Sequence, residues 1–203
     1  MSPSTRMPRR ERRAQLLDLA TAVFTDQGYQ GTSMDDIARA AGVTKPVLYQ
    51  HFASKEALYS EVIGVLGENL LREAAELTRY EGTPVERVRY GQRRFYELVS
   101  LENTLRLFTG KVELSAPVQA RVDAVLDALA LELASVVTAF REISEEEARI
   151  VGHAIIGITQ VSATLQHEAP DEDARERVLD TITTTIAHGL SGFTLLREEA
   201  LRE

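Results

Sequence analysis

Four side chains that donate hydrogen bonds stand within two helical turns of one another: Lys45, Tyr49, Gln50 and His51. An ammonium, a phenol and an imidazole all donate to phosphate oxygens, and a glutamine amide can pair with the major-groove edge of adenine. These residue types suit contacts to the backbone and the bases of DNA. They act together only if the elements that carry them present one common face.

The surrounding segment, residues 33–52, predicts two short helices joined by a tight turn at Gly42. Ser33 and Asp36 have the spacing of a capping box, which favours a helix start at this point. Thr44 is a candidate cap for the second helix, where a proline in the first turn is tolerated. Glycine suits the turn because it adopts a conformation that a residue with a Cβ resists.

Small and apolar residues in this segment have the spacing of a DNA-binding helix-turn-helix. Ala38 stands four residues before Gly42, where two steeply crossing helices need a small side chain. Leu48 and Phe52, four residues apart, give the second helix an inward face, so the four donors and Val47 project elsewhere. An ordinary helical hairpin in a bundle shares this local pattern, and only the flanking sequence separates the two interpretations.

The charge distribution favours the DNA-binding interpretation. The chain of 203 residues has a net charge of −8, but residues 1–55 hold eight basic and five acidic side chains and the remainder carries −11. A basic head on an acidic body is typical of a phosphate-binding module joined to a regulatory domain. A solvated basic tail would give the same split, so charge alone does not decide.

Composition excludes several classes of protein. There is no cysteine, which rules out disulfides and thiolate metal sites and indicates a reducing, cytoplasmic compartment. No apolar run approaches the roughly 20 residues that span a bilayer, so no membrane partner is expected. Four scattered histidines, with acids mostly at helix starts, offer neither a catalytic constellation nor a metal set. We therefore expect no enzyme, no metal site and no cofactor.

The rest of the chain is predicted to be helical throughout. Residues 1–8 are expected to form a disordered leader, residues 9–53 a three-helix domain and residues 54–203 a second, antiparallel helical domain. Capping patterns at Thr83, Ser144 and Asp171 mark helix starts, and no segment alternates like a strand. The fold class is therefore all-α, with about nine helices expected near residues 9–26, 33–41, 44–52, 54–80, 84–100, 101–108, 115–140, 144–167 and 171–196.

These motifs resemble the tetracycline-repressor (TetR) family of bacterial transcription regulators. The resemblance lies in the basic first helix, residues 28–38 and 41–52, and the start of the next helix at residues 54–58. It implies a homodimer whose two heads each place the second helix of the motif in a major groove of a palindromic operator. The residues that would approach base edges and the flanking backbone are Thr44, Lys45, Pro46, Val47 and Gln50.

Phosphate contacts are implied for a second group of residues, namely Ser33, Tyr49, His51 and Lys55. Pro46 departs from the family pattern, where a glycine is frequent, and its bulk restricts how closely the backbone approaches DNA. The resemblance also implies a small-molecule effector bound among the central helices. Polar and aromatic candidates on these otherwise apolar helices are Tyr96, Phe108, Phe140, Arg141, His153 and Gln160, and packing in the core is the alternative for each.

The last two helices, about residues 145–168 and 172–196, are the expected dimer interface. Each contains glycines, at 152, 157, 189 and 192, which cost a helix about 1 kcal/mol each relative to alanine. Close approach between two copies of the chain would offset that cost, and packing within one chain is the alternative. The leading function is a repressor that an effector releases from its operator. A DNA-binding regulator without an effector pocket is the runner-up.

Overall fold

The computed structural model describes residues 8–99, 104, 107 and 113–194, and these residues contain eight helices and no β-strand. The all-α prediction is confirmed. The predicted helix at 101–108 lies almost wholly outside the described residues. The helices are α1 (Arg9–Gly31), α2 (Met34–Ala40), α3 (Lys45–Tyr49), α4 (Lys55–Glu76), α5 (Pro84–Leu98), α7 (Ala116–Phe140), α8 (Glu145–Glu168) and α9 (Glu172–Leu190).

Most helix starts form as the capping patterns predict. Complete capping boxes begin α2 at Ser33, α5 at Thr83 and α8 at Ser144, and Asp171 caps α9. Thr44 is the exception, because its side chain makes no capping hydrogen bond. The next available donor is the N–H of Val47, since proline has none, and that N–H is bound to the Thr44 carbonyl at 3.0 Å.

The helix ends differ from the sequence prediction by several residues. Gly28, expected to end α1, does adopt a positive φ of 74°, but helical structure resumes after this kink and continues to Gly31. Gly42 has the predicted left-handed conformation, with φ of 63°. α4 ends at Glu76 rather than near residue 80, and α9 ends at Leu190 rather than near 196. Helix ends carry weaker sequence signals than helix starts.

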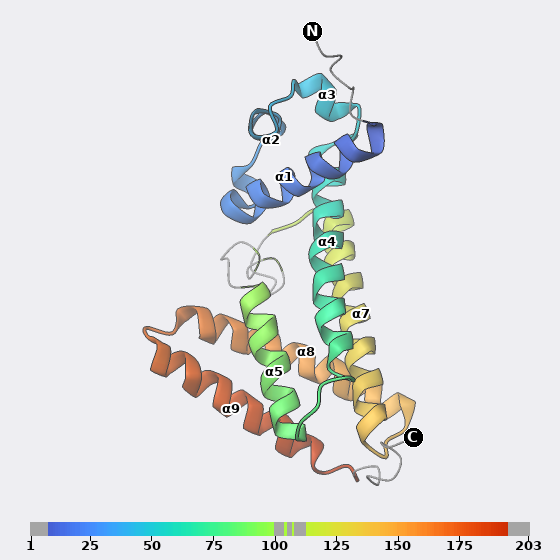
Figure 1. The fold of residues 1–203 in the computed structure, drawn as a ribbon, viewed down its shortest axis with the longest axis vertical. Helices are drawn as coiled ribbons and strands as arrows, with labels where there is room; N and C mark the ends of the chain where they lie inside the picture. The colour runs from blue at the N-terminus through green and yellow to red at the C-terminus, as the bar shows by residue number, and fades with distance from the viewer. Residues whose placement is uncertain (1–7, 100–103, 105–106, 108–112, 195–203) are drawn as a thin grey trace.

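Figure 1 shows the arrangement of the helices. α1, α2 and α3 form a head over the first turns of α4, and α7 runs alongside the rest of α4. α5, α8 and α9 pack at the end of the molecule away from the head. α8 and α9, which follow one another in sequence, run antiparallel. α4 and α7 instead lie side by side in the same direction, since Gly64 faces Arg121 and Gly67 faces Val125. The second domain is therefore not antiparallel throughout.

The core of the head continues into α4 without a break. Leu16, Phe24 and Leu48 are fully buried together with Leu58 of α4. Tyr59 joins this core, with its ring 4.7 Å from the rings of both Phe24 and Tyr29. Arg13 of α1 also pairs with Glu61 of α4 at 2.6 Å. The predicted boundary at residues 53/54 thus falls just before α4, whose first turns share the core of the head.

Gly152 serves packing within the chain. A Cβ at this position would collide with the backbone carbonyl of Ala130, so glycine allows α7 and α8 to approach closely. Gly157 and Gly189 have open space where a Cβ would lie. The four glycines therefore do not share one role. None of the described helices has the length and the apolar character required to cross a membrane.

Candidate functional site

The outer face of α3 presents a row of exposed polar groups. Leu48 is fully buried against the head, which turns Lys45, Tyr49 and Gln50 toward solvent. Tyr49 is 44% exposed, which is unusual for a large aromatic side chain. Thr44 and Pro46 are exposed at the start of the same helix, and Val47 is half-buried beside them. The structure therefore brings the base-edge candidates onto one surface.

A carboxylate of α2 holds the ammonium group of Lys45. Asp35 Oδ2 lies 2.8 Å from Lys45 Nζ, and this hydrogen bond and its charge raise the pKa of Lys45. Both side chains are well exposed, so the pair is screened by water and is easily exchanged. A phosphate or a base edge can replace the carboxylate when DNA approaches. The pair holds the long lysine side chain close to the start of α3 until then.

His51 lies at the end of α3 beside the arginines of α1. Its imidazole is half-buried, and Nδ1 has no hydrogen-bond partner. Arg9 donates to the backbone carbonyl of Gln50 at 3.2 Å, which fixes the start of α1 against α3. Burial, followed by the charges of Arg9, Arg13 and Arg12, lowers the pKa of His51. The imidazole therefore resists protonation and stands among cations that attract phosphate.

The two remaining DNA-contact candidates are already engaged. Ser33 and Asp36 form the reciprocal capping bonds of α2, with Ser33 Oγ donating to Asp36 Oδ2 at 2.5 Å. Lys55 Nζ lies 4.2 Å from the centre of the Tyr29 ring, and burial lowers the pKa of this lysine. Lys55 begins α4, where the positive end of the helix dipole adds to its charge. Both residues stay predicted phosphate contacts.

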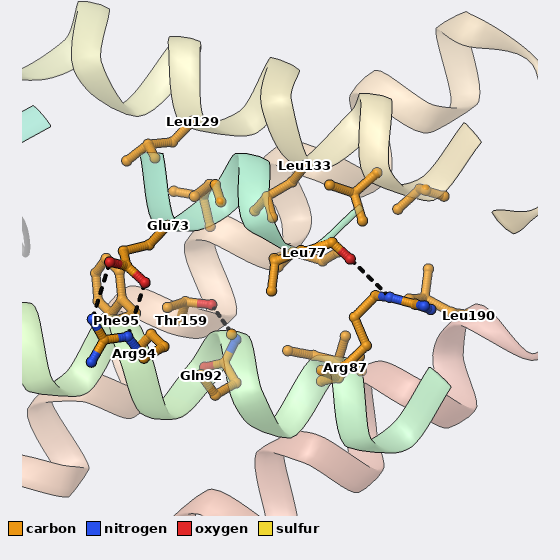
Figure 2. Close-up of a pocket in the computed structure, with 18 of the residues that line it drawn as sticks. Glu73, Leu77, Arg87, Gln92, Arg94, Phe95, Leu129, Leu133, Thr159 and Leu190 are labelled. Atoms are coloured by element: carbon orange, nitrogen blue, oxygen red, sulfur yellow. Dashed lines mark hydrogen bonds and ion pairs between the residues drawn. The ribbon is translucent and has the colours of Figure 1, made fainter. Parts of the chain in front are cut away.

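A mostly apolar cavity of about 130 Å³ lies at the other end of α4. Helices α4, α5, α7, α8 and α9 all contribute to its walls. Figure 2 shows Leu129 and Leu133 of α7 on one side and polar groups of α5 on the other. Arg94 and Glu73 pair at one end, Gln92 and Thr159 lie in the middle, and Arg87 lies at the opposite end. No group of three or more acidic or histidine side chains in the described part of the chain is placed to hold a metal ion.

The N-terminal head resembles a known family of proteins in sequence. Residues 16–62 match the family model described as bacterial regulatory proteins, tetR family. The HTH-type transcriptional activator FasR of Mycolicibacterium smegmatis is 44% identical over 94 residues, covering 46% of this chain and 43% of FasR. The HTH-type transcriptional repressor KstR2 of Mycobacterium tuberculosis is 36% identical over 77 residues, covering 38% of each chain.

The head of the chain is therefore of the TetR family. A TetR-family regulator from Streptomyces coelicolor of known structure has the same fold, with a TM-score of 0.74 over 92% of this chain and 90% of that one, at 19% identity. The sequence matches span less than half the length of the curated relatives. These relatives are named as transcription regulators, not as enzymes.

The six predicted effector contacts are not gathered in one place. Phe140 and Arg141 line the cavity. Tyr96 is buried outside it, where its hydroxyl donates to Ser162 at 2.8 Å. His153 is exposed on α8, and Gln160 is half-buried there without lining the cavity. Phe108 lies outside the described residues.

Sequence reasoning missed several residues that the structure brings to these two sites. The sequence counted Arg9 and Arg12 only toward the positive charge of the head. Their position beside α3 depends on how α1 packs, which residue spacing alone does not give. Arg87 and Gln92 of the cavity were not singled out. The signal for Gln92 was present: it lies four residues after Val88 and three before Phe95, so it shares their apolar helical face.

Proposed function

We propose that this TetR-family protein is a sequence-specific DNA-binding transcriptional regulator that acts in the cytoplasm as a homodimer. The observation that carries the proposal is the exposed face of α3, where Lys45, Tyr49 and Gln50 project together from a helix anchored by a fully buried Leu48. α3 would enter the major groove, with Gln50 at base edges and the arginines of α1 near the phosphate backbone.

An exposed apolar stripe on α8 supports the homodimer. Ile150, Val161 and Leu165 are 64%, 65% and 48% exposed, and Ala154 and Gly157 continue the same row. The five positions are spaced by four, three, four and four residues, so they lie along one face of the helix. Soluble proteins rarely leave such a stripe uncovered. A second copy, packed through α8 and α9, would cover it and pair the two heads.

An effector response is supported by the position of the cavity. α4 has 22 residues, about 33 Å at 1.5 Å per residue, and joins the cavity at one end to the core of the head at the other. A ligand that moves the cavity end of α4 would change the separation of the two heads. We propose that this change lowers affinity for a palindromic operator, which makes the protein a repressor released by its effector.

One observation favours the alternative, a DNA-binding regulator without an effector. The cavity of about 130 Å³ is smaller than the several hundred cubic ångströms typical of ligand pockets. It is close to the roughly 150 Å³ engineered cavity that binds benzene, so it admits a compact ligand only. A ligand-dependent fall in operator affinity would exclude the alternative.

The proposal is tested by binding of the full chain to the DNA upstream of its own gene. An electrophoretic mobility assay at moderate salt, with a scrambled fragment of equal length as control, measures specific binding. We expect a discrete complex on a fragment that contains an inverted repeat. Half-sites should be about one helical turn apart, 34–36 Å, or a multiple of that distance. Equal affinity for the scrambled fragment would contradict sequence-specific regulation.

A further inference from the structure

One end of the apolar cavity holds a guanidinium group that has no acidic partner. Arg87 donates through Nε to the carbonyl of Leu77 and through Nη2 to that of Tyr80, both at 2.9 Å. Its guanidinium carbon lies 3.7 Å from the centre of the Phe140 ring. Those contacts cap the end of α4 and use two of its five N–H donors. Among the described residues, no carboxylate forms an ion pair with Arg87.

A second guanidinium shares this end of the cavity. Arg141 follows Phe140 directly, lines the cavity and is only 8% exposed. Nη1 donates to the carbonyl of Phe193 at 3.2 Å, and the described carboxylates form no ion pair with it either. Burial lowers the pKa of both arginines. A partly desolvated cation without an acidic partner is unfavourable unless an anion joins it.

Arg94, the third arginine that lines the cavity, does have an acidic partner. Arg94 Nε and Nη2 bind the two oxygens of Glu73 at 2.9 and 3.0 Å, a bidentate pair that neutralises this end. The chain therefore supplies a carboxylate to Arg94 at one end of the cavity (Figure 2). Among the described residues it supplies none to Arg87 at the opposite end or to Arg141. The free fork-shaped donors of Arg87 and Arg141 match the geometry of a carboxylate.

An unpartnered acceptor lies between the two ends. Gln92 is 5% exposed and lines the cavity, and its Nε2 donates to Thr159 Oγ1 at 2.9 Å. Its Oε1 is buried and has no hydrogen-bond partner. Leaving a buried acceptor without a donor is unfavourable, and a ligand that donates to it would remove this penalty. This oxygen is independent of the arginines and also indicates a ligand.

We propose that the cavity binds a compact organic carboxylate, held at its anionic end by Arg87 and Arg141, with an O–H or N–H that donates to Gln92 Oε1. The apolar walls cover the body of the ligand, which is about the size of a benzene ring. The inference rests on the proposed effector response, since it names the ligand of that cavity. It goes further by excluding neutral and cationic effectors.

The test is titration calorimetry of the full chain, without DNA, against three probes of one shape. Benzoate carries the anion, benzamide is neutral and benzylamine is a cation. We expect benzoate to bind about tenfold or more tightly than benzamide, and benzylamine not to bind. Equal affinity for benzoate and benzamide would overturn the proposal, and so would the absence of any benzoate binding at millimolar concentration.

Variants of the two arginines test whether they bind the carboxylate of benzoate. Arg141→Gln and Arg87→Gln should each remove most of the advantage of benzoate over benzamide, whereas Arg87→Lys should keep part of it. Arg79→Gln is the matched control, because Arg79 is exposed and pairs with Glu76 on the surface. A thermal melt of each variant checks folding. If Arg87→Gln unfolds, Arg141→Gln carries the test, since the Arg141 side chain makes one hydrogen bond to the described residues. Unchanged benzoate affinity in a folded Arg141→Gln would overturn the assignment.

A second set of titrations tests whether Gln92 Oε1 accepts a hydrogen bond from the ligand. One of the two probes 3-hydroxybenzoate and 4-hydroxybenzoate should bind more tightly than benzoate, and Gln92→Leu should abolish that gain while leaving the preference for benzoate over benzamide. A gain that survives Gln92→Leu would overturn the role of Oε1. Operator binding is measured separately. If benzoate binds but operator affinity does not change, the proposed effector response fails and the carboxylate site stands.

Discussion

The side chain of Gln92 on α5 donates a hydrogen bond to the hydroxyl of Thr159 on α8 at 2.9 Å, and both residues are buried between the two helices. One turn further along, Tyr96 makes the equivalent bond to Ser162. These pairs fix α5 against α8 in one register, because any slip would leave several buried polar groups without partners.

Thr159→Val should destabilise the protein by about 1–3 kcal/mol, since it leaves both polar atoms of Gln92 buried and unsatisfied. Gln92→Leu combined with Thr159→Val should recover most of that loss, because no polar atom is then left behind. Denaturant unfolding of the wild type, both single variants and the double variant gives the coupling energy directly. Losses that simply add would argue against a coupled pair.

Tyr49→Ala and Gln50→Ala should have different effects on DNA binding. Loss of a phosphate contact at Tyr49 should weaken binding to all DNA sequences by a similar factor. Loss of a base contact at Gln50 should cost about 1–3 kcal/mol on the preferred site and relax the sequence preference at one base pair. Competition binding with a panel of single-base operator variants measures both. Uniform weakening by both substitutions would reject the role of Gln50.

His51 should make stability depend on pH in the neutral range. Because its pKa in the folded state lies below the usual 6.5, the unfolded chain binds more protons once the pH falls below that value. The stabilising contribution is therefore complete above pH 6.5 and is lost as the pH falls through the pKa of the folded state. Melting temperatures of the wild type and His51→Gln, measured from about pH 8 to about pH 5.5, give this dependence.

The expected result is a smaller fall in melting temperature for His51→Gln than for the wild type. Carboxylates with lowered pKa values, such as Glu73 beside Arg94, lose their contribution only at more acidic pH and leave this window undisturbed. Identical pH profiles for the two proteins would mean that the imidazole does not resist protonation in the folded state.

Val161→Glu should separate the homodimer, because it places a charge in the middle of the exposed stripe on α8. Leu131→Glu is the matched control, since Leu131 is an exposed apolar residue of α7. Light scattering after size exclusion should give a monomer for Val161→Glu and a dimer for the wild type and the control. A dimer that survives Val161→Glu would place the interface elsewhere.

The head could be predicted in detail because its structure is specified locally. Gly42 sets the turn, Ser33 and Asp36 start α2, and the spacing of Leu48 and Phe52 decides which face of α3 is buried. Each of these signals acts over a few residues of chain. Thr44 shows the limit of such reasoning, since its capping bond fails through competition for the N–H of Val47.

The cavity could not be predicted in the same way. Its walls come from five helices, so its lining depends on how those helices cross, and sequence spacing alone does not give the crossing. Phe140 and Arg141 were found because aromatic and charged residues are rare near an apolar helix end. Arg87 was missed because surface arginines are common on α5, and only the packing of Phe140 beneath it distinguishes it.

The central claim is that α3 of a homodimer reads DNA sequence, and selection of bound DNA from a random pool tests it most directly. The full chain is mixed with random duplexes at moderate salt, and the bound fraction is amplified and sequenced over several rounds. We predict enrichment of one inverted repeat, with half-sites about one helical turn apart or a multiple of it. A pool that remains random, although DNA is bound, would contradict the account.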